Sequence, residues 1–290
     1  MESCIKSINN IQMENSIFDD VCDWTYVILC CYDTYEREKN VFEQLELLRP
    51  TRNISLVYNK GYRHCYTEKV SEDLFEISKY IYKDMIDKNY NRVLILEDDF
   101  LLKKPIPVED VQSIVNFIEE VDPELYSLGS SSFFNPSYIF RKHVKLIGYM
   151  TPAHAYMINQ ELCKKVLNLN QRGRSPSEDI IVNNDYHIDL ILSISSEKYK
   201  YYKPLVYQLF PATENQKNWG VKGKFKKLLC KINVSLKIYF LKIDRQLEPG
   251  WTILYIIPYI QWIFLLLLLL AIPVLGMALW RRGCRTFYRK

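Results

Sequence analysis

The stretch VLILEDD, residues 93–99, decides how this chain folds. Its four aliphatic residues are typical of a strand buried on both faces, as in a parallel sheet. Three carboxylates follow at once, and the next cationic residue along the chain is Lys103. Open α/β sheets bind ligands at the carboxyl ends of their strands, and clustered carboxylates repel unless solvent or a cation offsets the charge. The stretch therefore indicates a divalent-metal site in an enzyme crevice.

The segments around this stretch alternate between strand and helix patterns. Helices are expected after the capping box of Asp33 and Glu36, after Ser71, after Pro107 and after Asn159. The expected strands cover residues 24–31, 54–58, 93–96, 125–128, 155–158 and 199–202. Residues 133–150 suggest loops or an antiparallel extension, and a further helix is expected near 180–193. This alternation predicts an α/β fold with a three-layer sheet.

The C-terminal part of the chain has the pattern of a membrane anchor. No charged residue occurs from Trp251 to Trp280, a stretch long enough to cross a bilayer, and Arg281 and Arg282 end it. Apolar residues recur at helical spacing over 222–243 with lysines on the other side, which predicts a basic amphipathic helix on a membrane surface. The lipid bilayer is thus an expected partner. Nucleic acid is not, because the basic residues gather near the span.

These features divide the chain into five parts. We expect a polar N-terminal segment (1–20), a catalytic domain (21–215), a basic membrane-proximal segment (216–250), a transmembrane anchor (251–280) and a basic tail (281–290). Residues 1–20 lack the apolar core of a signal peptide. A span near the C-terminus then favours tail anchoring with the domain in the cytosol. The sequons Asn53-Ile-Ser55 and Asn233-Val-Ser235 leave a luminal orientation open.

The eight cysteines include no CxxC pair, so we expect mostly reduced core thiols and no disulfide framework.

For the acidic cluster, spacing as Glu97-x-Asp99 lets two carboxylates chelate one Mn²⁺ or Mg²⁺. These ions prefer oxygen ligands and keep positions open for substrate phosphates.

Several motifs taken together resemble a known enzyme family. The segment Asn91–Phe100 (NRVLILEDDF) resembles the signature of metal-dependent GT-A glycosyltransferases, especially family 25, the lipopolysaccharide and collagen glycosyltransferase group. His154–Ile158 with the helix after it, His187–Asp189 and Lys203–Gln208 resemble later elements of that family, in the same order across about residues 24–210. The family's "GC…SH" element is reduced here to Gly61 and Cys65, and a C-terminal anchor is not the family's usual arrangement.

The resemblance implies a GT-A-like (Rossmann-like) fold and transfer of a sugar from a nucleotide-sugar donor, with inversion. The acceptor would be a hydroxyl of a glycan, lipid or protein. Mn²⁺ or Mg²⁺ at Glu97 and Asp99 would bridge the donor diphosphate and neutralise the charge of the leaving nucleotide.

The same resemblance suggests roles for further residues. Inversion needs a carboxylate base, for which Asp189 and Asp179 are the candidates, Asp189 matching the family block better. Apart from the resemblance, His154 and His187 are each a candidate for a third metal ligand or for a diphosphate contact. Arg37, after the first expected strand, is a candidate nucleotide contact, and Asp98 and Gln208 are further candidate donor contacts.

Two other interpretations remain open. One is a different metal-dependent phosphate chemistry, as in a nucleotidyltransferase or phosphodiesterase. The chain has only nine glycines and neither a GxGxxG nor a GxxxxGK phosphate loop, which disfavours this class. The other is a non-catalytic membrane protein with a degenerate GT-A domain, against which the three retained carboxylates argue.

Overall fold

The computed structural model describes residues 4–30, 34–61, 64–65, 70–129, 141–146, 154–168, 192, 194–202 and 205–208. All of them belong to the first of two units, Met1–Tyr239 and Phe240–Lys290. No helix within these ranges is long and apolar enough to span a bilayer. The predicted amphipathic helix and transmembrane anchor lie outside the described residues. So do the predicted loop and helix at 171–193, of which only Leu192 is described.

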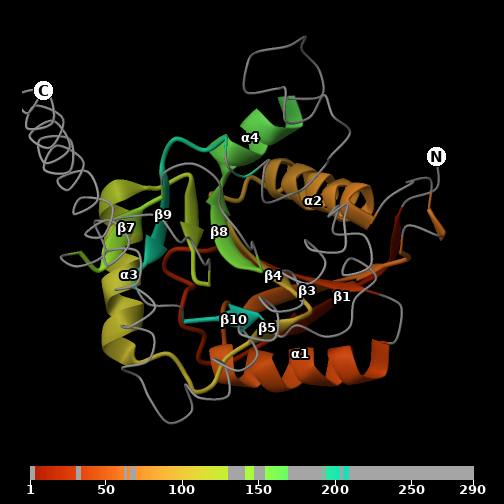
Figure 1. The fold of residues 1–290 in the computed structure, drawn as a ribbon, viewed down its shortest axis with the longest axis horizontal. Coiled ribbons are helices and arrows are strands. Elements are labelled where there is room, and N and C mark those ends of the chain that lie inside the picture. The colour runs from red at the N-terminus through yellow and green to blue at the C-terminus, as the bar shows by residue number, and fades with distance from the viewer. Residues whose placement is uncertain are drawn as a thin grey trace, which may run out of the picture. The chain divides into compact units, whose positions relative to one another are not determined.

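The main feature of the fold is one mixed sheet of eight strands in the order β1-β3-β2-β4-β8-β6-β9-β7 (Figure 1). Strands β2, β3 and β4 are parallel, whereas β8 runs antiparallel to both β4 and β6. This confirms an α/β fold with a mixed sheet. The strands are β1 (Ile5–Gln12), β2 (Trp24–Cys30), β3 (Asn53–Asn59), β4 (Arg92–Glu97), β6 (Leu125–Ser127), β7 (His143–Lys145), β8 (Ala155–Asn159) and β9 (Lys198–Tyr201).

Helices cover both faces of this sheet. Helices α1 (Thr34–Leu48) and α3 (Val108–Val121) bury apolar residues in the core on one face. Helices α2 (Val70–Asp87) and α4 (Gln160–Asn168) do so on the other. Because strand side chains alternate between faces, β4 gives Leu94 and Leu96 to the first core and Val93 and Ile95 to the second. The predicted three-layer arrangement is therefore confirmed, with β4 buried at its centre.

Most helix ends follow the expected local chemistry. Asn159 caps α4, since its Oδ1 accepts the backbone N–H of Leu162 at 3.0 Å. Helix α3 begins after Pro107 and ends at Asp122, which adopts a left-handed φ of 46°. The prediction for Ser71 was wrong, because α2 begins one residue earlier, at Val70, and Ser71 lies inside its first turn.

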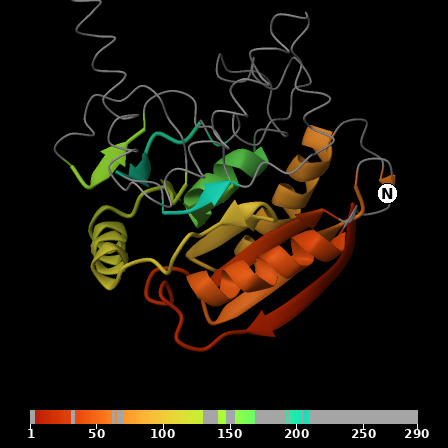
Figure 2. The ribbon, with the colours of Figure 1, turned by 60° about the horizontal axis from the view of Figure 1, so that its bottom comes forward.

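Two features were not expected from the sequence. Strand β1 lies within the N-terminal segment 1–20 and pairs antiparallel with β3 as an edge strand, visible along the border of the sheet in Figure 2. Its residues are mostly exposed, so its sequence IKSINNIQ lacks a hydrophobic signal. A second, two-stranded sheet joins β5 (Phe100–Leu101) to β10 (Tyr207–Gln208).

The far edge of the large sheet is organised around His143. Its ring stacks on Phe117 with centroids 4.1 Å apart. Its Nδ1 lies 2.8 Å from the hydroxyl of Tyr126, and its Nε2 lies 3.1 Å from Ser113 Oγ. Burial, with the nearby charge of Lys142, lowers the pKa of His143 from 6.5 to about 4. The folded protein therefore holds a neutral imidazole at this edge.

This shifted pKa predicts an acid-sensitive domain. The unfolded chain binds a proton at His143 more tightly than the folded one does. The contribution of the neutral His143 to the free energy of unfolding is therefore fully present above pH 6.5 and is lost as the pH falls toward 4. Urea unfolding of the full chain and of His143→Gln at several pH values measures this. The variant should lose less stability than the wild type over that interval. Equal losses in both proteins would contradict the assignment.

Candidate active site

The segment after β4 that begins with Asp98 and Asp99, the acidic loop, lies where the order of the strands reverses. The chain leaves the carboxyl end of β2 through α1 toward β3, but leaves the neighbouring β4 in the opposite direction, toward β6. Glu97 ends β4 and pairs with Ile28 of β2, and Asp98 and Asp99 follow it. Open α/β sheets form their binding crevice at such a reversal, outside the carboxyl ends of the two strands. The topology thus places the carboxylates at the position where a ligand is expected.

Helix α1 holds this loop through a polar stripe of Arg37, Asn40 and Gln44. The guanidinium of Arg37 donates to both oxygens of Asp98, at 2.8 and 3.0 Å. Asn40 Nδ2 donates to the carbonyl of Phe100 at 3.4 Å, and Gln44 Oε1 accepts the N–H of Leu102 at 2.6 Å. Residues three and four apart share one face of a helix, so the whole stripe reaches the loop.

The ion pair with Arg37 distinguishes Asp98 from its neighbours. Asp98 is 6% exposed and its carboxylate faces α1. Arg37 also supplies the positive charge that the sequence near the cluster lacks until Lys103. Both residues were expected to contact the donor. The structure gives them a shared role in fixing the loop, and donor contact by either one stays a prediction.

Glu97 and Asp99 are the two carboxylates of the cluster outside this ion pair. Glu97 is half-buried and its N–H donates to the carbonyl of His154 at 2.9 Å, while Asp99 is 9% exposed. Magnesium and related ions are bound at such sites by one or two carboxylates together with substrate phosphates. Two hard oxygen donors at the end of a central strand therefore fit the predicted Mn²⁺ or Mg²⁺. The third candidate ligand, His187, lies outside the described residues.

A second segment, residues 205–208, supports the loop from its other side. The N–H groups of Leu205 and Val206 donate to the carbonyl of Leu128 at 2.9 and 3.2 Å. The next residues form β10, in which Gln208 pairs with Phe100 directly after Asp99. The backbone of Gln208 is therefore adjacent to the acidic loop, and contact of Gln208 with the donor stays a prediction.

His154 connects this segment to β8. It is 2% exposed, and its Nε2 lies 3.0 Å from the carbonyl oxygen of Val206. A carbonyl only accepts, so Nε2 carries the proton. A Cβ on Gly129 would lie 2.3 Å from that nitrogen and 2.2 Å from the Val206 oxygen, so only glycine fits there. The structure gives His154 a supporting role, and contact with the donor stays a prediction.

The structure thus brings together Arg37, Glu97, Asp98, Asp99, His154 and the backbone of Gln208 around the carboxyl end of β4. Asp179, His187 and Asp189 lie outside the described residues. The sequence interpretation missed Asn40, Gln44 and Gly129. The polar residues at 37, 40 and 44, beside the apolar face of Val41, Leu45 and Leu48, were the signal that could have found the stripe.

No protein-family model matches the sequence, and a search of curated proteins finds no match. Solved structures that resemble the chain include the following three. "A197 from STIV" is 11% identical with a TM-score of 0.37, over 64% of this chain and 86% of that one. A glycosyltransferase involved in glycosylation of the major capsid of PBCV-1 is 10% identical with a TM-score of 0.35, over 67% and 96%. The glycosyltransferase GlyE of Streptococcus pneumoniae TIGR4 is 11% identical with a TM-score of 0.35, over 72% and 59%. All three likenesses are distant, with identities of 10–11% and TM-scores of 0.35–0.37.

The ion pair of Arg37 and Asp98 should stabilise the domain measurably. Double-variant cycles give couplings of about 0.5–3 kcal/mol for residues in contact and about 0–1 kcal/mol for exposed ion pairs. The side chain of Arg37 is 19% exposed and that of Asp98 7%, so we expect a coupling of about 2 kcal/mol. Urea unfolding of Arg37→Met, Asp98→Asn and the double variant gives this value. A coupling below about 0.5 kcal/mol would mean that the pair behaves as an exposed one.

Proposed function

We propose that this chain is a metal-dependent glycosyltransferase that uses a nucleotide-sugar donor. The observation that carries the proposal is the acidic cluster at the strand reversal. One of its carboxylates is held by Arg37, and Glu97 and Asp99 follow a buried strand where a ligand crevice is expected. The resemblance of residues 91–100, 154–158 and 203–208 to family 25 gives the class of donor.

Each residue of the candidate site then has a defined role. Glu97 and Asp99 would hold Mn²⁺ or Mg²⁺. The bound cation would supply positive charge that stabilises the leaving nucleoside diphosphate. Arg37, Asn40 and Gln44 keep the loop in place, so that the two carboxylates are positioned before the donor arrives.

The acceptor hydroxyl must lose a proton as its oxygen attacks the sugar. For a transfer with inversion we assign this task to Asp189, with Asp179 as the alternative base. The bond from the anomeric carbon to the diphosphate oxygen breaks as the new glycosidic bond forms. The diphosphate leaves with the electron pair. The anchor at 251–280 would keep the domain at a membrane, where a glycan, lipid or protein acceptor is within reach.

Donor turnover tests this proposal. The full chain, purified in detergent, is incubated with Mn²⁺ and a panel of nucleotide sugars, and the release of nucleoside diphosphate is measured. Asp99→Asn and Glu97→Gln should each lower kcat/KM on the order of 100-fold or more, because losing one ligand removes several kcal/mol of charge stabilisation. Glu119→Gln, an exposed carboxylate of α3, is the control and should retain full activity.

The products separate the competing functions. A glycosyltransferase releases a nucleoside diphosphate, whereas a nucleotidyltransferase releases pyrophosphate from a nucleoside triphosphate. Pyrophosphate release that depends on Asp99 would show that the chain is a nucleotidyltransferase. If no donor in the panel is turned over with Mn²⁺ or Mg²⁺, the proposal fails and the degenerate-domain interpretation stands.

A further inference from the structure

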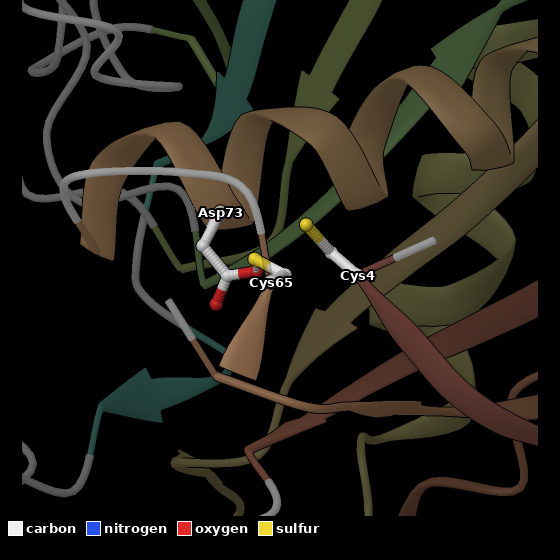
Figure 3. A group of neighbouring side chains, drawn as sticks. All are labelled: Cys4, Cys65 and Asp73. Carbon is white, nitrogen blue, oxygen red and sulfur yellow. Dashed lines mark hydrogen bonds between the residues drawn. The ribbon is translucent and has the colours of Figure 1, made fainter. Parts of the chain in front are cut away.

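Two thiols and a carboxylate meet at the carboxyl end of β3, two strands from the acidic loop. Cys4 precedes β1, Cys65 follows β3, and Asp73 lies in the first turn of α2. Figure 3 shows the three side chains pointing toward one another. Their two sulfurs and one carboxylate oxygen all lie within 4.8 Å of one another. Cys4 is 4% exposed and Asp73 2%, so the cluster is largely buried.

The spacing of the three donors allows them to share one tetrahedral ion. With Zn–S bonds near 2.3 Å and Zn–O bonds near 2.1 Å, two neighbouring ligand atoms lie about 3.6–3.8 Å apart. The observed distance from Cys65 Sγ to Asp73 Oδ1 is 3.4 Å. A small adjustment therefore brings both atoms into the coordination sphere of one cation.

The surroundings hold these donors in position. Asn59 Nδ2 donates to Asp73 Oδ2 at 2.6 Å, which directs the other oxygen toward Cys65. The Oδ1 of Asn59 accepts the N–H of Gly61 at 2.7 Å, so the amide itself is fixed. Cys4 is placed by the N–H of Lys60, which donates to its carbonyl at 2.8 Å. Hydrogen bonds that orient a ligating carboxylate are a common feature of protein metal sites.

We propose that Cys4, Cys65 and Asp73 bind a zinc ion, with one tetrahedral position left for water or another ligand. Two thiolates favour zinc over magnesium or manganese, which prefer oxygen donors alone. The carboxylate distinguishes this arrangement from a thiol pair meant only for a disulfide, which needs no third donor. The ion would join the edge strand β1, the segment after β3 and the start of α2, and so stabilise this end of the domain.

Cobalt provides a direct probe, because thiolate ligands give Co²⁺ a sulfur-to-metal charge-transfer band and carboxylates alone do not. Tag-free full chain in detergent, reduced and stripped of metal, is titrated with Co²⁺ and then with Zn²⁺. We expect one Co²⁺ per chain with this band, displaced by one Zn²⁺. Cys4→Ser and Cys65→Ser should each weaken Co²⁺ binding at least about 10-fold. Asn59→Ala should weaken it about 10–100-fold with the band retained.

Cys22→Ser and Cys163→Ser are the matched controls, because these buried thiols lie elsewhere in the domain, and both should bind Co²⁺ as the wild type does. Zn²⁺ should also raise the Tm of the wild type and of the controls but not of Cys4→Ser. Absence of the band in the reduced wild type would overturn the proposal without reference to any variant. So would Co²⁺ affinity and band intensity that are undiminished in both Cys4→Ser and Cys65→Ser, or a disulfide between Cys4 and Cys65 in protein purified without reductant.

Discussion

The contact between the polar stripe of α1 and the loop after β4 is the constraint on which the candidate site depends. Helix α1 must bury Val41, Leu45 and Leu48 against the sheet while Arg37, Asn40 and Gln44 reach the loop. Both requirements are met because the two sets follow helical spacing on adjoining faces. The ion pair then offsets one of three crowded negative charges, which lowers the repulsion that a cation at Glu97 and Asp99 must overcome.

The acidic loop is held from both sides, and this explains why distant segments matter to it. Strand β10 pairs with β5 immediately after Asp99, and the segment leading into β10 is tied to Leu128 and His154. Gly129 permits that close approach. A site built on paired backbone is more precisely placed than one on a free loop, which suits a reaction that depends on positioning and charge.

Patterns within a few residues predicted much of this structure, and contacts across the chain did not follow from them. Four aliphatic residues sufficed for β4, and helical spacing sufficed for the buried face of α1. Strand β1 was not predicted, because a polar edge strand has no apolar alternation. The partner of Arg37 is 61 residues away, and Cys4, Cys65 and Asp73 have no metal-motif spacing, so only the folded backbone brings them together.

Calorimetric titration with a nucleoside diphosphate, with and without Mn²⁺, measures whether Glu97 and Asp99 bind the donor diphosphate through a cation. If they do, Mn²⁺ tightens binding to the wild type by at least about 10-fold, or ~1.4 kcal/mol, and Asp99→Asn loses this gain. Equal affinity with and without Mn²⁺ in the wild type, or an undiminished gain in Asp99→Asn, would contradict this role of the two carboxylates.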